Sequence, residues 1–500
     1  MEPAEENTAM RSDRIRLGIL AAVALLVAPC STFAQTTNTD AAIAELREIL
    51  AEQRSALDRQ ARTIEEQGRT LAALQQRVEA ANRSTEERRV LEAPALSAAA
   101  TTVVAQAPAP QQPASRTAAE RTPDLPAMVV SAGEFPGSIR IPGTESAFKL
   151  GGQARLVAVH TLSALGTEDR FVTSSIPVAV PQAGEEARTV YSPIASRLST
   201  ELRMPSQRGP LRLFIESDFA GAGRTSRLRH AFLQTNRFVV GQTWSTFSDP
   251  EADTIGIDFE GLNAISRFRQ PLFRWTPSGT AARYQWAFAV ENPAPDLTGA
   301  EGLNFTPDFV ARLKWHPDRK RGLAVYADHI QASLLVRQLR GEVTGQEGDA
   351  LITGGIGGNI SGVLVPRWDA DDRIKFAVNA GSGIGRYIAD LSSLGGQDAV
   401  YDDVQVSLRA LPVASGYFGY EHAWSRVFTT AVTYGVVNVS NLDIQPEEAF
   451  HRTQRTSINL LWNPVPFADI VIEFLAGTRV NRNGQRASSS QIQSGWTLKF

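Results

Sequence analysis

The sequence has little cysteine, little excess charge and no long apolar run. Cys30 is the only cysteine among 500 residues, and it falls in a segment that we expect to be removed, which excludes disulfides and cysteine-bound metal in the mature chain. The 50 basic and 53 acidic residues give a formal net charge of −3, which excludes the basic footprint of a nucleic-acid-binding protein. With 43% hydrophobic and 21% charged residues, the chain is neither disordered nor a bundle of membrane helices.

Motifs of enzyme chemistry are also missing. The six histidines show no H-E-x-x-H spacing, and there is no G-x-S-x-G elbow and no phosphate-cradling loop. We interpret the pairs Gly354-Gly355 and Gly357-Gly358 as a flexible loop rather than a nucleotide site. A hydrolase built on an isolated Ser/His pair, with His422 as the base, stays open, but no motif selects it. We therefore expect no enzyme activity, no cofactor and no metal site.

The first 34 residues have the features of a signal peptide. Arg11, Arg14 and Arg16 precede an apolar run at 17–28 that is too short to span a bilayer, and small residues follow at 32–34. The acidic residues at 2–6 fit a signal peptide poorly, so Met10 is an alternative start. A membrane-anchoring helix and a lipoprotein modified at Cys30 are the other interpretations, although Pro29 fits lipoprotein processing poorly.

A heptad repeat at 43–81 predicts a coiled coil within 40–92. Position a is apolar in six successive heptads: Ile43, Leu50, Leu57, Ile64, Leu71 and Val78. Position d holds Leu46, Gln53, Gln60, Gln67, Leu74 and Ala81. Glutamine layers inside a helical seam can fix the register and the number of helices, and we favour a periplasmic trimer over a dimer. The alternative is a solitary solvated helix. From 93 to 136 the composition is rich in Ala and Pro, as is typical of a linker.

From 137 to 500 the pattern changes to a two-residue alternation of apolar and polar side chains. It is clear at 282–291, 309–315, 373–380 and 470–474, and turn signals such as Asn463-Pro464 separate the runs. Tryptophans lie near the ends of the apolar faces, and the chain stops in a strand with Trp496, Leu498 and Phe500 on one face. We interpret these three residues as a barrel-assembly signal.

A soluble β-sandwich would show the same alternation, but the aromatic ends and the terminal Phe500 favour a membrane barrel, in which the apolar face meets lipid and the polar face lines a lumen. At about 22 residues per strand and connection, this region predicts about 16 antiparallel strands. The predicted fold class is therefore an all-β transmembrane barrel preceded by an α-helical trimeric coiled coil.

Five segments are similar to the DcaP-like porins of Gram-negative bacteria. They are 169–178 (DRFVTSSIPV), 196–203 (SRLSTELR), 240–245 (VGQTWS), 269–275 (RQPLFRW) and 383–388 (GIGRYI). The likeness extends from about residue 140 to the end and is weaker between 390 and 490. It implies a trimeric sixteen-stranded porin of the outer membrane that has an N-terminal coiled coil and prefers negatively charged substrates such as dicarboxylates.

Basic residues recur on the polar faces of the early strands. The predicted pore-lining set is Arg197, Arg203, Arg212, Arg227, Arg229, Arg267, Arg269, Arg283, Arg312 and Lys314. Guanidinium groups stay charged at any relevant pH and suit carboxylates, so a ladder of them would attract anions. Alternatively, these residues pair with lumen acids to stiffen the wall, or lie at the rims against lipopolysaccharide.

Two functions follow from these patterns. The first is an anion-preferring porin for passive diffusion, with small anionic solutes, outer-membrane lipid, lipopolysaccharide and the barrel-assembly machinery as partners of a homotrimer. The second is a structural or adhesive trimeric anchor, in which the coiled coil is the working part and the barrel is plugged. Single-channel conductance would separate the two.

Overall fold

The computed structural model describes residues 131–179, 184–207, 209–317, 325–343 and 350–500. The predicted signal peptide and coiled coil, and most of the predicted linker, lie outside the described residues, so they stay predictions. Within the described ranges, no helix is long and apolar enough to cross a membrane.

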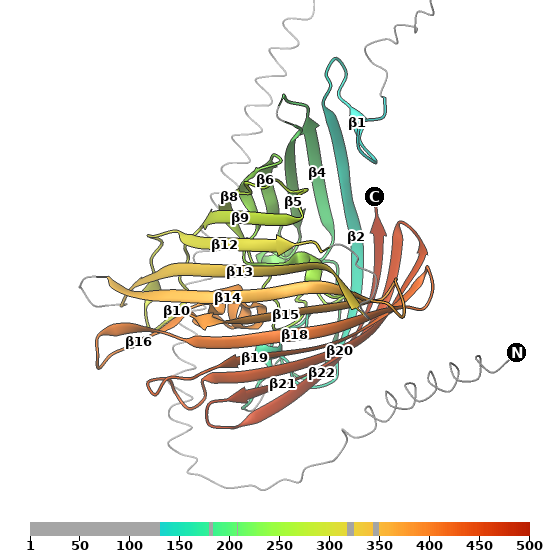
Figure 1. Cartoon of the computed structure of the whole chain (residues 1–500). Coiled ribbons are helices and arrows are strands. Elements are labelled where there is room, and N and C mark those ends of the chain that lie inside the picture. The colour runs from blue at the N-terminus through green and yellow to red at the C-terminus, as the bar shows by residue number, and fades with distance from the viewer. Residues whose placement is uncertain (1–130, 180–183, 208, 318–324, 344–349) are drawn as a thin grey trace, which may run out of the picture. The chain divides into compact units, whose positions relative to one another are not determined.

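Sixteen antiparallel strands of the described chain close into a barrel (Figure 1). One part of the wall consists of β2 (Ala147–Thr161), β4 (Arg197–Met204), β5 (Leu211–Asp218), β6 (Arg227–Gln234), β7 (Phe238–Trp244), β8 (Arg269–Trp275), β9 (Tyr284–Glu291) and β12 (Asp308–Trp315). The rest consists of β13 (Val325–Glu342), β14 (Leu351–Pro366), β15 (Arg373–Ser382), β18 (Pro412–Ala423), β19 (Phe428–Val439), β20 (Phe450–Val465), β21 (Ala468–Asn481) and β22 (Arg486–Lys499). The last strand pairs with the first from Gln153↔Lys499 to Thr161↔Gln491, which confirms the predicted barrel of about 16 strands.

Shorter strands and helices lie before and between the sixteen barrel strands. They are β1 (Ile139–Arg140), β3 (Arg188–Ser192), β10 (Leu297–Thr298), β11 (Glu301–Gly302), β16 (Ala399–Asp402), β17 (Ser407–Ala410), the single-turn helices η1 (Thr173–Ser175), η2 (Ala222–Arg224), η3 (Pro250–Ala252) and η4 (Gly385–Tyr387), and the helix α3 (Ala389–Leu394). β3 and β4 pair with successive parts of β2 and together occupy one position in the barrel.

The connections differ at the two ends of the barrel. Short turns join the strands at the end where β2 begins and β22 stops, which we call the turn end. Three of the longer connections at the other end, the loop end, position the site. We call them L1 (162–187), L3 (245–268) and L6 (383–411).

The two faces of the wall have opposite character. Outward side chains are apolar and exposed, as at Ile458 and Leu460 of β20, which are 49% and 45% exposed. The residues between them are polar and buried, as at Ser457 and Asn459, each 3% exposed. A soluble sandwich would bury the apolar face, so this inside-out pattern belongs to a barrel with lipid outside and a polar lumen.

Aromatic rings gather on the outer face near the turn end. Tyr284 and Trp315 stack with ring centroids 6.3 Å apart, and Phe428 and Trp462 do so at 6.0 Å. Each of these residues lies at or near the end of its strand. The expected interfacial girdle is therefore present at this end, because amphipathic rings favour the boundary between lipid and water.

Two sequence interpretations were wrong. Gly354-Gly355 and Gly357-Gly358 belong to β14 rather than to a loop. A Cβ on Gly357 would lie 2.7 Å from Cγ2 of Ile384, so the glycine lets L6 approach the wall. The turn expected at Asn463-Pro464 comes later, because β20 continues through an irregularity to Val465.

Candidate functional site

L3 crosses the lumen and is bound to the opposite wall. The backbone N–H groups of Ile255 and Ile257 each donate a 2.7 Å hydrogen bond, to Glu421 of β18 and Glu473 of β21 respectively. Asn459 of β20 donates from Nδ2 to the carbonyl of Ile255 at 2.7 Å. Because L3 leaves the wall at β7 and returns at β8, these bonds hold it across the interior, where it narrows the passage.

The root of L3 is fixed through one carboxylate. Asp249 accepts hydrogen bonds of 2.8 Å from Nε2 of His329 and from the hydroxyl of Ser361, and Lys314 lies 3.4 Å away. These partners come from β13, β14 and β12. Burial alone would raise the pKa of Asp249, but the hydrogen bond from His329 and the charge of Lys314 outweigh it and lower the pKa to about 2.

L6 also folds into the barrel and docks on L3 and L1. The backbone N–H groups of Ala389 and Asp390 donate to the carbonyls of Ile265 and Asn263 at 3.0 and 3.1 Å. Ser174 of L1 donates its backbone N–H to the Asp390 carboxylate at 2.9 Å and its hydroxyl to the Asp390 carbonyl at 2.7 Å. Three loops thus meet at one residue and enclose the passage together.

Buried ion pairs lock L6 to the wall. Arg337 of β13 donates to Asp398 of L6 at 2.8 Å and lies 3.3 Å from Asp308 of β12, and all three side chains are fully buried. The hydroxyl of Tyr387 donates to Asp308 at 2.7 Å. Removing one partner of a buried pair of this kind costs several kcal/mol, about 3–5, so these contacts fix L6 against the wall.

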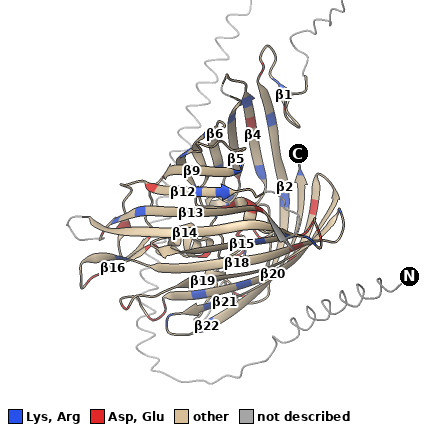
Figure 2. Ribbon diagram, in the orientation of Figure 1, with Lys and Arg blue, Asp and Glu red and all other residues tan. Residues whose placement is uncertain are grey.

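The three loops and the early strands enclose a cavity of about 230 Å³ that we call the arginine cavity. Its wall contains a single acid, Glu260, and seven arginines: Arg170, Arg197, Arg227, Arg229, Arg267, Arg269 and Arg386. Figure 2 shows basic positions on the strands that surround the lumen, among them β2, β4 and β12. Convergence of this many guanidinium groups creates a positive potential, which low-dielectric walls strengthen.

Acids neutralise four of the seven arginines. Asp218 accepts a bidentate pair from Arg227 at 3.0 and 2.8 Å, and Arg229 bonds both Asp218 and Glu216 at 2.8 and 2.7 Å. The other two pairs are Arg267 with Asp253 at 2.6 Å and Arg170 with Asp169 at 2.9 Å.

A β-bulge aims Arg229. Leu228 pairs with Ser217 and His230 pairs with Glu216, so Arg229 is the extra residue of β6. Both Arg229 and His230 are buried. Bulges re-aim side chains in this way beside functional sites.

The remaining three arginines make no ion pair with any described residue. Arg197 has a buried Nε without a hydrogen-bond partner in the described chain. The guanidinium of Arg269 lies 4.6 Å from the Trp244 ring, and that of Arg386 lies 4.4 Å from the Phe268 ring. The cavity therefore carries uncompensated positive charge.

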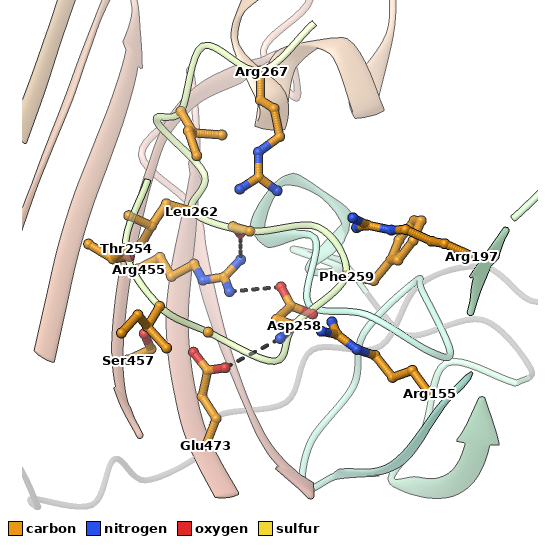
Figure 3. A pocket seen from close by; sticks show the side chains of 14 residues that line it. Arg155, Arg197, Thr254, Asp258, Phe259, Leu262, Arg267, Arg455, Ser457 and Glu473 are labelled. Carbon is orange, nitrogen blue, oxygen red and sulfur yellow. Dashed lines mark hydrogen bonds and ion pairs between the residues drawn. The ribbon is translucent and has the colours of Figure 1, made fainter. Parts of the chain in front are cut away.

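A second cavity, of about 160 Å³, adjoins the first through Arg197, Phe259 and Arg267, which line both. In Figure 3, Arg155 and Arg197 reach into it from one side and Glu473 from the other. Its acids are already bound: Asp258 pairs with Arg455 at 2.8 Å, and Glu473 accepts from the backbone of L3. We call it the crossing cavity.

A third cavity lies on the other side of the arginine cavity, with which it shares Arg170, Glu260 and Ser393. Glu168 and Asp169 also line it, so it is acidic. Burial raises the pKa of Glu260, although its carboxylate accepts a 2.6 Å hydrogen bond from Ser393. Of the three adjoining cavities, the crossing cavity and the arginine cavity are therefore lined mainly by arginines and the third mainly by acids.

Five of the ten predicted pore-lining residues line the arginine cavity: Arg197, Arg227, Arg229, Arg267 and Arg269. Arg267 belongs to L3 rather than to a strand. Near the turn end, Arg203 and Arg212 share Glu201 at 2.6 and 3.0 Å.

The other three predicted residues also lie outside this cavity. Lys314 pairs with Asp249 and Glu251, and Arg312 is on β12 with a buried Nε. Arg283 lies in the turn before β9, with its guanidinium 5.7 Å from the Tyr284 ring.

Arg155, Arg170, Arg386 and Arg455 also line these cavities but are not in the predicted pore-lining set. Arg170 and Arg386 lie within the segments 169–178 and 383–388 that carried the family likeness, which was the available signal. Arg155 is in β2 and donates from Nε to Thr497 of β22 at 3.0 Å; its position inside the barrel follows from closure of the last strand on the first.

The neighbourhood of His422 shows no hydrolytic arrangement among the described residues. Its Nδ1 lies 2.8 Å from Asp372, and its ring packs edge-on against Trp424. Asp369, Asp372 and His422 bring three potential metal ligands within 4.8 Å of one another. Tyr420, His422 and the Ala423 backbone already bond Asp372, so the structure accounts for this cluster without a metal.

No family model and no curated protein sequence matches the chain. Among solved structures, the fold is similar to that of the outer membrane channel DcaP of Acinetobacter baumannii, with a TM-score of 0.62 and 17% identity over 74% of this chain and 100% of that chain. An anion-selective porin from Comamonas acidovorans follows, with a TM-score of 0.47 and 12% identity over 71% and 100% of the two chains. The first similarity confirms the expected DcaP-like barrel at the level of the fold.

Proposed function

We propose that this chain is an outer-membrane porin through which small, preferentially anionic solutes, including dicarboxylates, diffuse passively. The single observation that carries the proposal is the arginine cavity, where Arg197, Arg269 and Arg386 point into the narrowed passage without ion pairs to described residues. A passage of this kind lowers the free energy of an anion and raises that of a cation. The barrel with an apolar exterior, and its likeness to a solved outer membrane channel, support the location.

The neutralised arginines have a structural part in this proposal. Arg227, Arg229 and Arg267 form ion pairs with acids and so hold the wall and L3 in place. Both readings of the arginine ladder therefore apply, but to different residues.

We further propose that the barrel works as a homotrimer whose subunits meet at the short-stranded wall. The strands β4 to β9 and β12 have only seven or eight residues, whereas β13 and β14 have 18 and 16. Eight residues tilted by about 45° cover roughly 19 Å, less than the apolar band of about 25 Å. A neighbouring subunit would cover the part of this wall where the strands are too short to match the lipid layer.

The flanking parts of the chain fit the same proposal. The outward row of Trp496 and Leu498 on β22 and Phe500 just after it is 46%, 57% and 61% exposed, as a signal for the barrel-assembly machinery would need to be. Both ends of the barrel domain lie at the turn end, which would be the periplasmic side, where the coiled coil at 40–92 would trimerise.

Planar-bilayer recording tests the main proposal. The purified full chain should give ionic steps of steady size, and its reversal potential in a KCl gradient should have the sign set by chloride. A silent protein would support the anchor alternative, and a reversal potential set by potassium would contradict the anion preference.

A further inference from the structure

Arg386 differs from the other arginines of the cavity in how it is held. Its Nη2 donates to Oε1 of Gln270 at 3.0 Å, and its Nη1 lies 3.4 Å from the carbonyl of Asn292. Its guanidinium packs over the Phe268 ring at 4.4 Å. These partners are neutral, so they fix the orientation of the guanidinium without forming an ion pair; the carboxylates of Asp308 and Asp398, both bound by Arg337, act on it only at longer range.

Burial makes this charge costly when the passage is empty. Arg386 is only 6% exposed, and an enclosed charge without a direct ion pair is unfavourable. A guanidinium has five N–H donors, of which the two neutral acceptors use two. An oxyanion in the cavity would accept hydrogen bonds from the remaining donors and form the direct ion pair that Arg386 lacks.

The rest of L6 serves to present this side chain. The backbone N–H of Arg386 donates to Asp398 at 3.0 Å, and Asp398 is held by Arg337 at 2.8 Å. The next residue, Tyr387, is bound to Asp308 and to Gln270. Gln270 thus bonds both Arg386 and Tyr387. Contacts from β8, β12 and β13 together fix the position of Arg386.

We propose that Arg386 is the specificity-determining residue of the passage, a fixed fork supplied by L6 that binds carboxylate and similar oxyanions. Arg197 and Arg269 contribute positive electrostatic potential, whereas Arg386 contributes an oriented hydrogen-bonding contact. This inference rests on the proposed function, but it concerns the choice among anions rather than the choice of anions over cations. It also makes the constriction a product of two loops, with L3 as one wall and L6 as the other.

The test uses the full-length trimer in planar bilayers with succinate as the probe, added to a KCl solution until it halves the chloride current. R386Q removes charge and fork, and R386K keeps the charge but loses the fork. The matched control is R409Q, which removes an arginine on the same loop that is 37% exposed and paired with Asp402 at 3.3 Å. Heat-modifiable gel mobility verifies folding, and should R386Q fail to fold, R386K alone decides.

We expect R386Q to raise the half-blocking succinate concentration about tenfold, as for loss of a charge-assisted hydrogen bond. R386K should raise it about threefold or more while keeping the wild-type reversal potential in KCl, and R409Q should stay within about twofold. Folded R386Q within about twofold of wild type, R386K equal to wild type, or a wild-type channel that succinate does not block would each overturn the inference. The proposed function fails separately, if the wild-type channel shows no anion preference in KCl alone.

Discussion

Arg455 of β20 and Asp258 of L3 form a 2.8 Å ion pair in which each side chain is 2% exposed. Arg455 also donates to the carbonyl of Phe171 in L1 at 2.9 Å and to that of Gly261 in L3. One side chain of the far wall therefore holds two of the loops that narrow the passage.

We predict that Arg455→Met loosens L3 and L1. Removal of one partner from a buried pair costs about 3–5 kcal/mol, so the open-channel current should become noisier and the temperature at which the barrel unfolds in detergent should fall. Arg409→Met is the control, because Arg409 is 37% exposed and its partner Asp402 keeps hydrogen bonds from the backbone N–H groups of Val404 and Gln405. Equal noise in both variants would contradict a role for Arg455 in holding the loops.

Anion preference should depend on the arginines without acidic partners. The double variant Arg197→Ser with Arg269→Ser should lower the permeability ratio of chloride to potassium by about threefold or more. A unit charge about 8 Å away contributes about 2 kcal/mol at an effective dielectric constant of about 20, and the salt in the passage screens part of this. The matched double variant Arg203→Ser with Arg212→Ser removes the same charge but should change the ratio less, because both residues lie near the turn end and outside the arginine cavity. Reversal potentials in a KCl gradient measure both, and the opposite ranking would refute the assignment.

Alternation in the sequence was sufficient to predict the strands and which side of each faces the lumen, because side-chain direction follows from two-residue periodicity alone. The expected runs at 309–315 and 373–380 fall within β12 and β15. Periodicity cannot locate a single extra residue in a strand. It predicted that Arg229 faces the lumen, but not that a bulge turns both Arg229 and His230 inward.

The local sequence pattern did not predict where the loops lie inside the barrel. A glycine at position 357 of β14 makes room for Ile384 of L6, a contact between residues far apart in sequence. Likewise, Arg386 joins Arg197 in one cavity only because L6 is locked by Arg337 and Asp398. Such positions depend on tertiary partners, and the sequence showed them only as segments that resemble a family.

The short-stranded wall should carry the subunit contact. Phe273 of β8 and Ile360 of β14 both face outward and are 46% and 55% exposed, but only Phe273 is on the short wall. Phe273→Gln should shift the protein from trimer to monomer in native gels and cross-linking, because it places a polar amide in a packed interface. Ile360→Gln, on the long wall, should leave the trimer intact. If Ile360→Gln dissociates the trimer and Phe273→Gln does not, the interface lies elsewhere.

The Asp249 carboxylate should make the root of L3 sensitive to acid but not to neutral pH. Its pKa is lowered to about 2 in the folded chain, from an ordinary value of about 3.9. For a lowered carboxyl pKa, the stabilisation is present above the ordinary value and is lost as the pH falls through the folded value. Current noise in the wild-type channel should therefore stay constant from pH 7 to about 4 and increase below that.

Asp249→Asn removes the charge that His329 and Lys314 face, so its channel should be noisy at pH 7 and change little on acidification. Glu251→Gln is the matched control, because Glu251 pairs with Lys314 at 2.8 Å but is 64% exposed, which screens the interaction. Its channel should resemble the wild type at pH 7. A quiet Asp249→Asn channel at neutral pH would show that the bonds from L3 to Glu421 and Glu473 are enough to hold the loop without its root, since those bonds use the backbone of L3 and do not involve Asp249.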